Sequence, residues 1–265
     1  MSKELSIEEI KALQLEILNH LDAFCRENGI KYALCNGSLL GAIKYHGYIP
    51  WDDDIDVCLL REDYNRLVKE HQDPQGRFSL RCFERDRSFL FPFAKMEDTN
   101  TDLVEAGSKS ATFGVNIDVF PIDSFGDTPD EVENTSKIFN RLRKHLNCAK
   151  LRSYSSRNIG RSILKFGYCF PFRLVGAQRY CKRIMAWARR GKGRYYGDVV
   201  WGFYGPGEAF QRAMFEEMTE VEFEGRLYPA PRSFDEYLTG LYGDWRQDPP
   251  PEKQKTHHSF KAYKK

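Results

Sequence analysis

The chain has 265 residues, with 40 Lys and Arg against 38 Asp and Glu, and 41% of it is hydrophobic. This composition excludes global disorder, and the length is sufficient for one large domain or two small ones. The longest stretch without a charged residue is 32–43, twelve residues, whereas a membrane-spanning helix needs about 20. The polar, acidic start of the chain is unlike a signal peptide, so we expect a cytoplasmic protein without a membrane span.

Helices and strands are predicted to alternate in the first half of the chain. Apolar residues in 5–27 recur at helical spacing, and Asn28-Gly29 is a typical helix end. Helices are expected at 5–27, 39–46, 61–71 and 129–147, and strands at 30–34, 55–60, 78–83, 91–95, 102–105 and 115–120. The alternation predicts an α+β fold in which a mixed sheet is flanked by helices.

The second half of the chain is dominated by a basic stretch. Residues 134–197 contain 17 Lys or Arg and no Asp or Glu, whereas residues 1–133 contain 14 basic and 26 acidic side chains. A basic helix is expected at 174–190, and an extended segment with three consecutive prolines at 244–258. Charge therefore divides the chain into an acidic part at 1–133, a basic helical region at 134–197, and a C-terminal segment at 198–265.

A basic stretch interleaved with aromatic residues suits three surroundings. It can rest on an anionic membrane, bind nucleic acid, or form a solvated helical face that balances the acidic part. The sequence contains no recognisable nucleic-acid-binding motif, so we expect no nucleic-acid partner. The aromatic segment 166–172 is expected either to enter a membrane interface or to belong to the core.

The seven cysteines form no metal-binding or disulfide pattern. They stand at positions 25, 35, 58, 82, 148, 169 and 181. Their number is odd and no Cys-x-x-Cys pair occurs. Buried, reduced thiols are therefore expected.

An acidic motif precedes one of the predicted strands. Its carboxylates are Asp52, Asp53, Asp54 and Asp56. Four carboxylates so close in sequence repel one another, and this repulsion is tolerated in a solvated turn or around a cation. Asp54 and Asp56 alternate as an apolar strand begins, so their side chains are expected to share a face. A calcium loop of the EF-hand type would need Gly and Glu where Val57 and Asp63 stand. The pattern favours Mg²⁺, or else Mn²⁺, together with substrate phosphates.

A third carboxylate is needed for a site with two metal ions. Asp118 lies inside an apolar strand pattern, where an unpaired carboxylate would cost several kcal/mol in desolvation. A metal ion would remove that cost, and the alternative is a solvent-facing position on an edge strand. Asp123 lies beyond Pro121 and ranks lower.

Gly37-Ser38 stands between a predicted strand and a predicted helix. A helix N-terminus beside a glycine presents free N–H groups to a phosphate, although a structural turn is the default for this pair. The order Gly-Ser, helix, Asp-x-Asp and a later strand Asp is the arrangement of the nucleotidyltransferase fold of polymerase-β type.

The acidic motif and its surroundings resemble a known family. The run from Leu34 to Val57 and the following Arg61-Glu-Asp-Tyr64 resemble the signature of the LicD family of phosphocholine transferases. Similar elements recur at 116–123, at 237–244 and from Pro249 to His258, so that about half of the chain is covered.

The resemblance implies a fold, a reaction and a set of partners. It implies transfer of phosphocholine from CDP-choline to a sugar hydroxyl of a cell-surface glycan, of teichoic acid or lipopolysaccharide type, with release of CMP. The acceptor is expected to be lipid-linked, and two Mg²⁺ ions are expected as cofactors. Relatives move ethanolamine-like or pentitol phosphates, and a non-catalytic nucleotide-binding protein is the rival interpretation.

The resemblance implies that residues 1–133 form the catalytic core and that residues 198–265 complete the active site. It also implies roles for individual residues. Asp54, Asp56 and Asp118 are expected to bind the metal ions, and Asp118 is the candidate general base. Gly37 and Ser38 are expected to hold a nucleotide phosphate. The remaining candidates are Lys95 and Arg61, for each of which a salt bridge is the alternative to phosphate contact, and His257 and His258, for which a frayed terminus is the alternative.

Overall fold

The computed structural model describes residues 3–105, 113–151, 159–256 and 260–265. The chain forms two compact units. The first unit comprises Met1–Arg81, Ala94–Pro121 and Gln211–Lys265, and the second comprises Cys82–Phe93 and Ile122–Phe210. Both units are therefore assembled from segments that are distant in sequence, and the charge-based division at 133 and 197 stays a prediction.

The helices of the first unit are α1 (Ile7–Asn28), α2 (Asn36–Tyr45), α3 (Arg61–Glu70) and α7 (Phe234–Tyr242). Helix α1 begins where the Ser6 side chain accepts a hydrogen bond from the Glu9 amide and the Glu9 side chain accepts one from the Ser6 amide. It ends at Gly29, which has φ +60°. Ile17 and Leu21 of α1 are fully buried, which confirms the predicted core-facing stripe.

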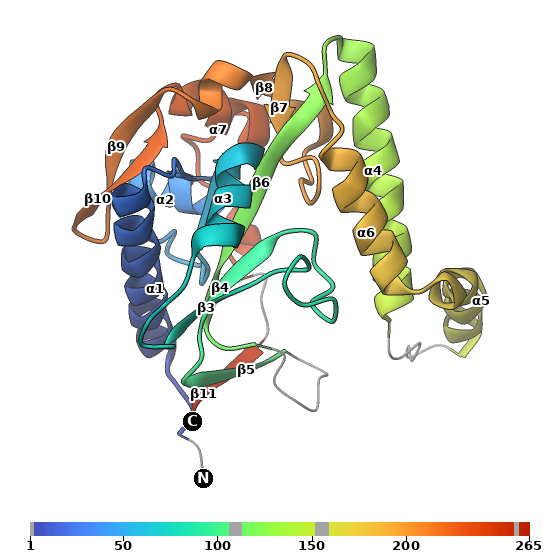
Figure 1. The fold of residues 1–265 in the computed structure, drawn as a ribbon, viewed down its shortest axis with the longest axis horizontal. Coiled ribbons are helices and arrows are strands. Elements are labelled where there is room, and N and C mark those ends of the chain that lie inside the picture. The colour runs from blue at the N-terminus through green and yellow to red at the C-terminus, as the bar shows by residue number, and fades with distance from the viewer. Residues whose placement is uncertain (1–2, 106–112, 152–158, 257–259) are drawn as a thin grey trace. The chain divides into compact units, whose positions relative to one another are not determined.

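The main sheet of the first unit has the strand order β1-β2-β6-β4-β3. Its strands are β1 (Ala33–Leu34), β2 (Asp56–Leu60), β3 (Phe78–Arg81), β4 (Ala94–Asp98) and β6 (Asn116–Gly126). Two antiparallel pairs accompany it, namely β5 (Thr101–Glu105) with β11 (Phe260–Lys264) and β9 (Met218–Phe223) with β10 (Arg226–Pro231). Figure 1 shows β11 beside β5 near the N-terminus of the chain. Because β6 lies between β2 and β4, it is an interior strand of this sheet.

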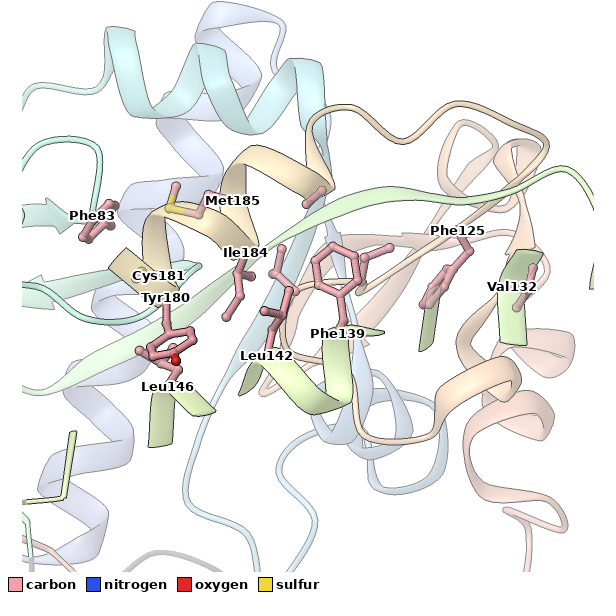
Figure 2. Close-up of a cluster of buried hydrophobic side chains, with 13 residues drawn as sticks. Phe83, Phe125, Val132, Phe139, Leu142, Leu146, Tyr180, Cys181, Ile184 and Met185 are labelled. Carbon is pink, nitrogen blue, oxygen red and sulfur yellow. The ribbon is translucent and has the colours of Figure 1, made fainter. Parts of the chain in front are cut away.

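The second unit is mainly helical. It contains α4 (Pro129–Lys150), α5 (Ile159–Val175), α6 (Ala177–Ala188) and the strand β7 (Tyr195–Gly197), and Phe210 at its end begins the short strand β8 (Phe210–Gln211). Helices α4 and α6 lie side by side, and α5 lies at one end of the pair (Figure 1). Figure 2 shows the core between them, in which Leu142 and Leu146 of α4 face Tyr180 and Ile184 of α6. This unit therefore has its own hydrophobic core.

The α+β class is confirmed, whereas the polymerase-β type of nucleotidyltransferase fold stays a prediction. One predicted helix was wrong: 174–190 comprises the end of α5 and all of α6, separated at Gly176, which has φ +90°. The segment 166–172 is helical, and the hairpin of β9 and β10 was not predicted. All seven cysteines are buried and free, as expected. Within the described ranges, no helix combines the length and apolarity that crossing a membrane requires.

Candidate active site

The acidic motif lies on a loop that is fixed from two sides within the first unit. After α2 the chain turns back on the helix so closely that a Cβ on Gly41 would overlap the carbonyl oxygen of Gly47. The turn of the β9–β10 hairpin also fixes the segment that follows α2, because the Tyr48 amide donates a hydrogen bond to the Glu224 carboxylate, with N···O 3.1 Å. The Gln14 side chain donates to the Asp53 carbonyl oxygen at 2.9 Å. The loop is thereby positioned before its carboxylates are considered.

Asp56 is the centre of the carboxylate cluster. It begins β2, and its neighbour Ile55 accepts a hydrogen bond at 2.9 Å from the amide of Asp118 on β6. Burial raises the pKa of Asp56 well above its ordinary value, and the nearby charges of Asp54 and Asp118 raise it further, with a smaller effect from Asp52. The charges of Asp54 and Asp118 therefore act on Asp56, and the assignment of the three residues to one metal site stays a prediction.

The start of α2 holds Asp56 in place. The Ser38 hydroxyl oxygen accepts a hydrogen bond from the Asp56 amide at 2.8 Å. The Asn36 side-chain amide donates to the Asp56 carboxylate at 3.2 Å. Asn36 has φ +49°, a left-handed conformation that asparagine tolerates better than most residues. Cys35, the residue before α2, makes no side-chain capping hydrogen bond, so the cap residue itself provides no oxygen to the N-terminal amides of this helix.

Lys95 forms an ion pair with Asp118 and also donates a hydrogen bond to the Asn116 side-chain oxygen at 3.0 Å. The pairing follows from register, because Lys95 of β4 lies directly opposite Asp118 of β6. Asp118 lies on an interior strand, which excludes the alternative of an edge position. Of the two predicted interpretations of Lys95, the structure contains the salt bridge.

Asp54, Asp56 and Asp118 offer carboxylate oxygens to a divalent cation. Carboxylate oxygens are the ligands that Mg²⁺ prefers, and the mutual repulsion at Asp56 is of the kind that a bound cation relieves. In the described part of the chain, no three His, Cys, Asp or Glu side chains are already grouped so that they could hold a metal ion. The residues fit the cation by their chemistry, and Lys95 supplies the positive charge at Asp118.

The remaining predicted residues lie in different parts of the chain. A Cβ on Gly37 would lie 2.8 Å from the Asp52 carboxylate, so this glycine lets the acidic loop approach α2 closely. Arg61 begins α3, with its guanidinium 4.9 Å from the ring centre of Tyr64. Asp123 is buried in the second unit. His257 and His258 lie outside the described residues.

Sequence reasoning missed Tyr237 as part of this arrangement. Its hydroxyl donates a hydrogen bond to the Asn36 side-chain oxygen at 3.1 Å, while the Asn36 amide binds Asp56. Tyr237 lies on α7, which is about 200 residues away in sequence. The available signal is the motif at 237–244, which resembles the family but whose sequence alone indicates no role for Tyr237.

Comparison with known proteins identifies the relatives of this chain. A family model described as "LicD/FKTN/FKRP, nucleotidyltransferase domain" matches residues 29–153. The chain is 30% identical over 267 residues to the lipopolysaccharide cholinephosphotransferase LicD of Haemophilus influenzae, covering 98% of this chain and 99% of that protein. Uncharacterized proteins of Rickettsia typhi and Rickettsia prowazekii are 40% and 39% identical over 62 residues, which is 23% of this chain and 20% and 23% of theirs.

The matched region contains the acidic loop, Lys95 and Asp118, and the similarity to the Haemophilus protein extends over both units. The first unit is thus an α+β unit in which the carboxylates of Asp54, Asp56 and Asp118 influence one another at the main sheet. The chain belongs to the LicD family, which confirms the family predicted from its motifs.

Proposed function

We propose that this chain is a phosphotransferase that moves phosphocholine from CDP-choline to a sugar hydroxyl of a cell-surface glycan, with release of CMP. The support from similarity is the Haemophilus relative, whose name states cholinephosphotransferase activity on lipopolysaccharide. A glycan of lipopolysaccharide or teichoic acid type, attached to a lipid carrier, is the proposed acceptor.

The observation that carries the proposal is the convergence of carboxylates on Asp56. Burial and like charges both oppose ionisation there, which is a costly arrangement for stability alone. Phosphoryl transfer requires charge neutralisation and alignment more than covalent help from the protein. The carboxylates around Asp56 provide cation ligands for charge neutralisation. The neighbouring amides at the start of α2 can bind a phosphate and so align it.

Asp54, Asp56 and Asp118 would hold two divalent ions, Mg²⁺ or else Mn²⁺. When bound, these ions would neutralise the phosphate oxygens and make the acceptor hydroxyl more acidic. Asn36 and Ser38 orient Asp56 through its carboxylate and its amide. Asp118 is proposed to accept the proton of the acceptor hydroxyl, which requires its Oδ1 atom to release Lys95.

Positively charged and amide groups would bind the phosphates. The amides of Gly37 and Ser38 are proposed to bind a nucleotide phosphate at the start of α2. Lys95, once it leaves Asp118, is proposed to contact the same anion. His257 and His258 are proposed to approach the donor diphosphate.

A donor panel tests this function. The wild-type protein would be incubated with Mg²⁺, a glycan acceptor and, in turn, CDP-choline, CDP-ethanolamine, CDP-ribitol or CDP-glycerol, and CMP release would be measured with and without EDTA. We expect CDP-choline to be the best donor and EDTA to abolish CMP release. A better rate with another donor would reassign the transferred group, and CMP release from none would favour a non-catalytic nucleotide-binding protein.

Two carboxylate variants distinguish the loss of a proposed metal ligand from a general effect of removing a negative charge. Asp118→Asn is expected to lose nearly all turnover, and retention of more than about a tenth of the wild-type rate, roughly 1.4 kcal/mol, would refute the two-metal assignment. Asp102→Asn is the matched control. Asp102 lies on β5 with its side chain 45% exposed and paired to Lys265 at 3.3 Å, so its removal should leave turnover unchanged.

A further inference from the structure

Helix α5 of the second unit exposes large apolar side chains. Leu164, Leu174 and Ile163 are 75%, 71% and 65% exposed. Phe166 and Phe170 are also exposed, with ring centres 5.2 Å apart. Contiguous exposed apolar surface of this kind marks an interaction site more often than scattered single residues do.

The apolar residues lie on the side of α5 that faces away from the rest of its unit. The inner side is defined by two contacts to α4, in which Cys169 meets Cys148 with a sulfur–sulfur distance of 2.8 Å and the Phe172 ring stacks on His145 with centroids 4.2 Å apart. At about 100° per residue, positions 163, 167, 170 and 174 form one stripe, roughly opposite positions 169 and 172. The helix therefore packs by its narrow inner side and presents its apolar stripe outward.

The next helix exposes a basic groove. Residues of α6 and of the turn after it line a hollow of about 280 Å³, namely Arg179, Lys182, Arg183, Ala186, Trp187 and Arg190. Their spacing of three and four residues places them on one face of the helix, opposite the buried Cys181 and Ile184. Four cations and an amphipathic indole side by side suit an anionic group at the boundary between water and an apolar phase.

The charge of the surroundings identifies one occupant. Residues 134–197 contain no Asp or Glu, so two copies of this chain that met through α5 would place like charges opposite each other. A lipid bilayer with anionic headgroups is complementary in both respects, since its apolar interior accepts the stripe and its phosphates attract the cations. Lys165 and Arg173 on α5 have stems long enough for their charges to remain at the headgroups.

We propose that α5 and α6 form a peripheral membrane-docking surface, in which the apolar stripe of α5 enters the interface and the basic groove of α6 binds anionic lipid headgroups. The proposal uses only the second unit and does not depend on the identity of the donor. It makes lipid, rather than a soluble glycan or a second copy of the chain, the partner of this unit.

Flotation of the full chain with vesicles tests the proposal. Phosphatidylcholine vesicles with about one third phosphatidylglycerol, and vesicles of phosphatidylcholine alone, would be compared at low salt and at about 0.5 M NaCl. We expect binding to the anionic vesicles that falls at least about tenfold at high salt or without phosphatidylglycerol. Absence of binding to the anionic vesicles at low salt would overturn the proposal.

Matched variants assign the binding to the two helices. Ile163→Glu with Leu174→Glu should reduce vesicle binding at least about tenfold, whereas Leu227→Glu, at a leucine 58% exposed on the β9–β10 hairpin, should not. Lys182→Glu with Arg183→Glu should weaken binding, and Lys69→Glu with Lys253→Glu applies the same change of charge to the first unit. Circular dichroism would verify that each variant is folded.

Two results would contradict this assignment. Equal loss of binding in the controls would show a non-specific effect of charge. If Ile163→Glu with Leu174→Glu abolished self-association in light scattering and left vesicle binding intact, the apolar stripe would belong to an interface between copies.

Discussion

The first unit carries 21 Lys and Arg against 29 Asp and Glu, whereas the second carries 19 against 9. The excess charges are arranged differently. In the first unit, carboxylates lie near one half-buried residue, Asp56, and raise its pKa. In the second unit, cations such as Arg179 and Lys182 spread along an exposed helix face. Like charges gathered at one point destabilise the folded state unless a counter-ion binds there. Charges spread over the surface destabilise it little and remain available to an extended partner.

Buried carboxylates occur in both units, so burial alone does not identify a site. Burial raises the pKa of Asp198 to about 7 and that of Glu208 to about 8. Amides partly oppose this effect, because Trp201 donates a hydrogen bond to Asp198 at 2.8 Å, and the Arg143 charge acts in the same direction. Carboxylate neighbours raise the pKa in both units, since Asp123 acts on Asp198 and Asp198 acts on Glu208, but Arg143 lowers the pKa of both. The largest effects on Asp56 are burial and the charges of Asp54 and Asp118, and the Asn36 hydrogen bond opposes them. The proposed catalytic carboxylate therefore differs from those of the second unit in the charges that surround it.

The largest expected effect concerns Asp56. Asp56→Asn should reduce turnover by about 10³-fold or more, roughly 4 kcal/mol, because it removes a proposed cation ligand. The same change should raise the unfolding temperature at neutral pH, because a neutral amide avoids the burial and repulsion that oppose the charge. Steady-state CMP release and thermal unfolding measure the two effects. Lower activity together with lower stability would instead indicate a structural carboxylate like those of the second unit.

A second prediction concerns the packing that positions the acidic loop. Gly41→Ala should destabilise the first unit by about 2–3 kcal/mol, because the new Cβ would overlap the Gly47 carbonyl and approach the Ile49 amide to 3.1 Å. Gly167→Ala is the matched control in the second unit. It meets no atom within 4 Å and lies within helix α5, so it should stabilise that helix by about 0.5–1 kcal/mol. Denaturant unfolding of both variants measures the difference, and equal effects would show that the loop tolerates a side chain at Gly41.

Much of the first unit could be predicted because its signals are local. Periodicity and the Asn28-Gly29 end placed α1, and alternation of apolar residues with Asp54 and Asp56 placed the cluster at the start of a strand. The Lys95–Asp118 pair could not be predicted, because it depends on the register of β4 against β6, which only the folded sheet sets. The Tyr237 contact depends in the same way on the packing of α7 against the start of α2.

The second unit was harder to predict for a different physical reason. Helix α5 turns its apolar stripe outward, so the usual inference from apolar periodicity to a core face leads to the wrong side. The break at Gly176 was not recognised, because the basic residues continue on both sides of it. In the first unit, the hairpin of β9 and β10 had a usable signal, since Glu224-Gly225 is a two-residue turn between alternating segments.

A third prediction concerns the response of the second unit to pH. Since the folded pKa of Glu208, about 8, exceeds its ordinary value of 4.5, its contribution to stability is fully present below about pH 4.5 and is lost as the pH rises toward 8. Hydrogen exchange of 198–210, corrected for the intrinsic rate, should therefore be faster at pH 8 than at pH 6. Glu208→Gln should remove most of this dependence. A dependence unchanged in the variant would assign the effect to Asp198, which titrates in the same direction.

The smallest expected effect tests how Asp56 is held. Tyr237→Phe removes the hydroxyl that donates to Asn36, which itself donates to Asp56. We expect a loss of about 0.5–1.5 kcal/mol, a two- to tenfold decrease in kcat with little change in the KM for the donor, because the hydrogen bond orients a carboxylate ligand and does not contact the donor. Tyr168→Phe, at a tyrosine 59% exposed in the second unit, is the control and should match the wild type. A Tyr237→Phe variant that changed KM alone would move Tyr237 from positioning Asp56 to binding the donor.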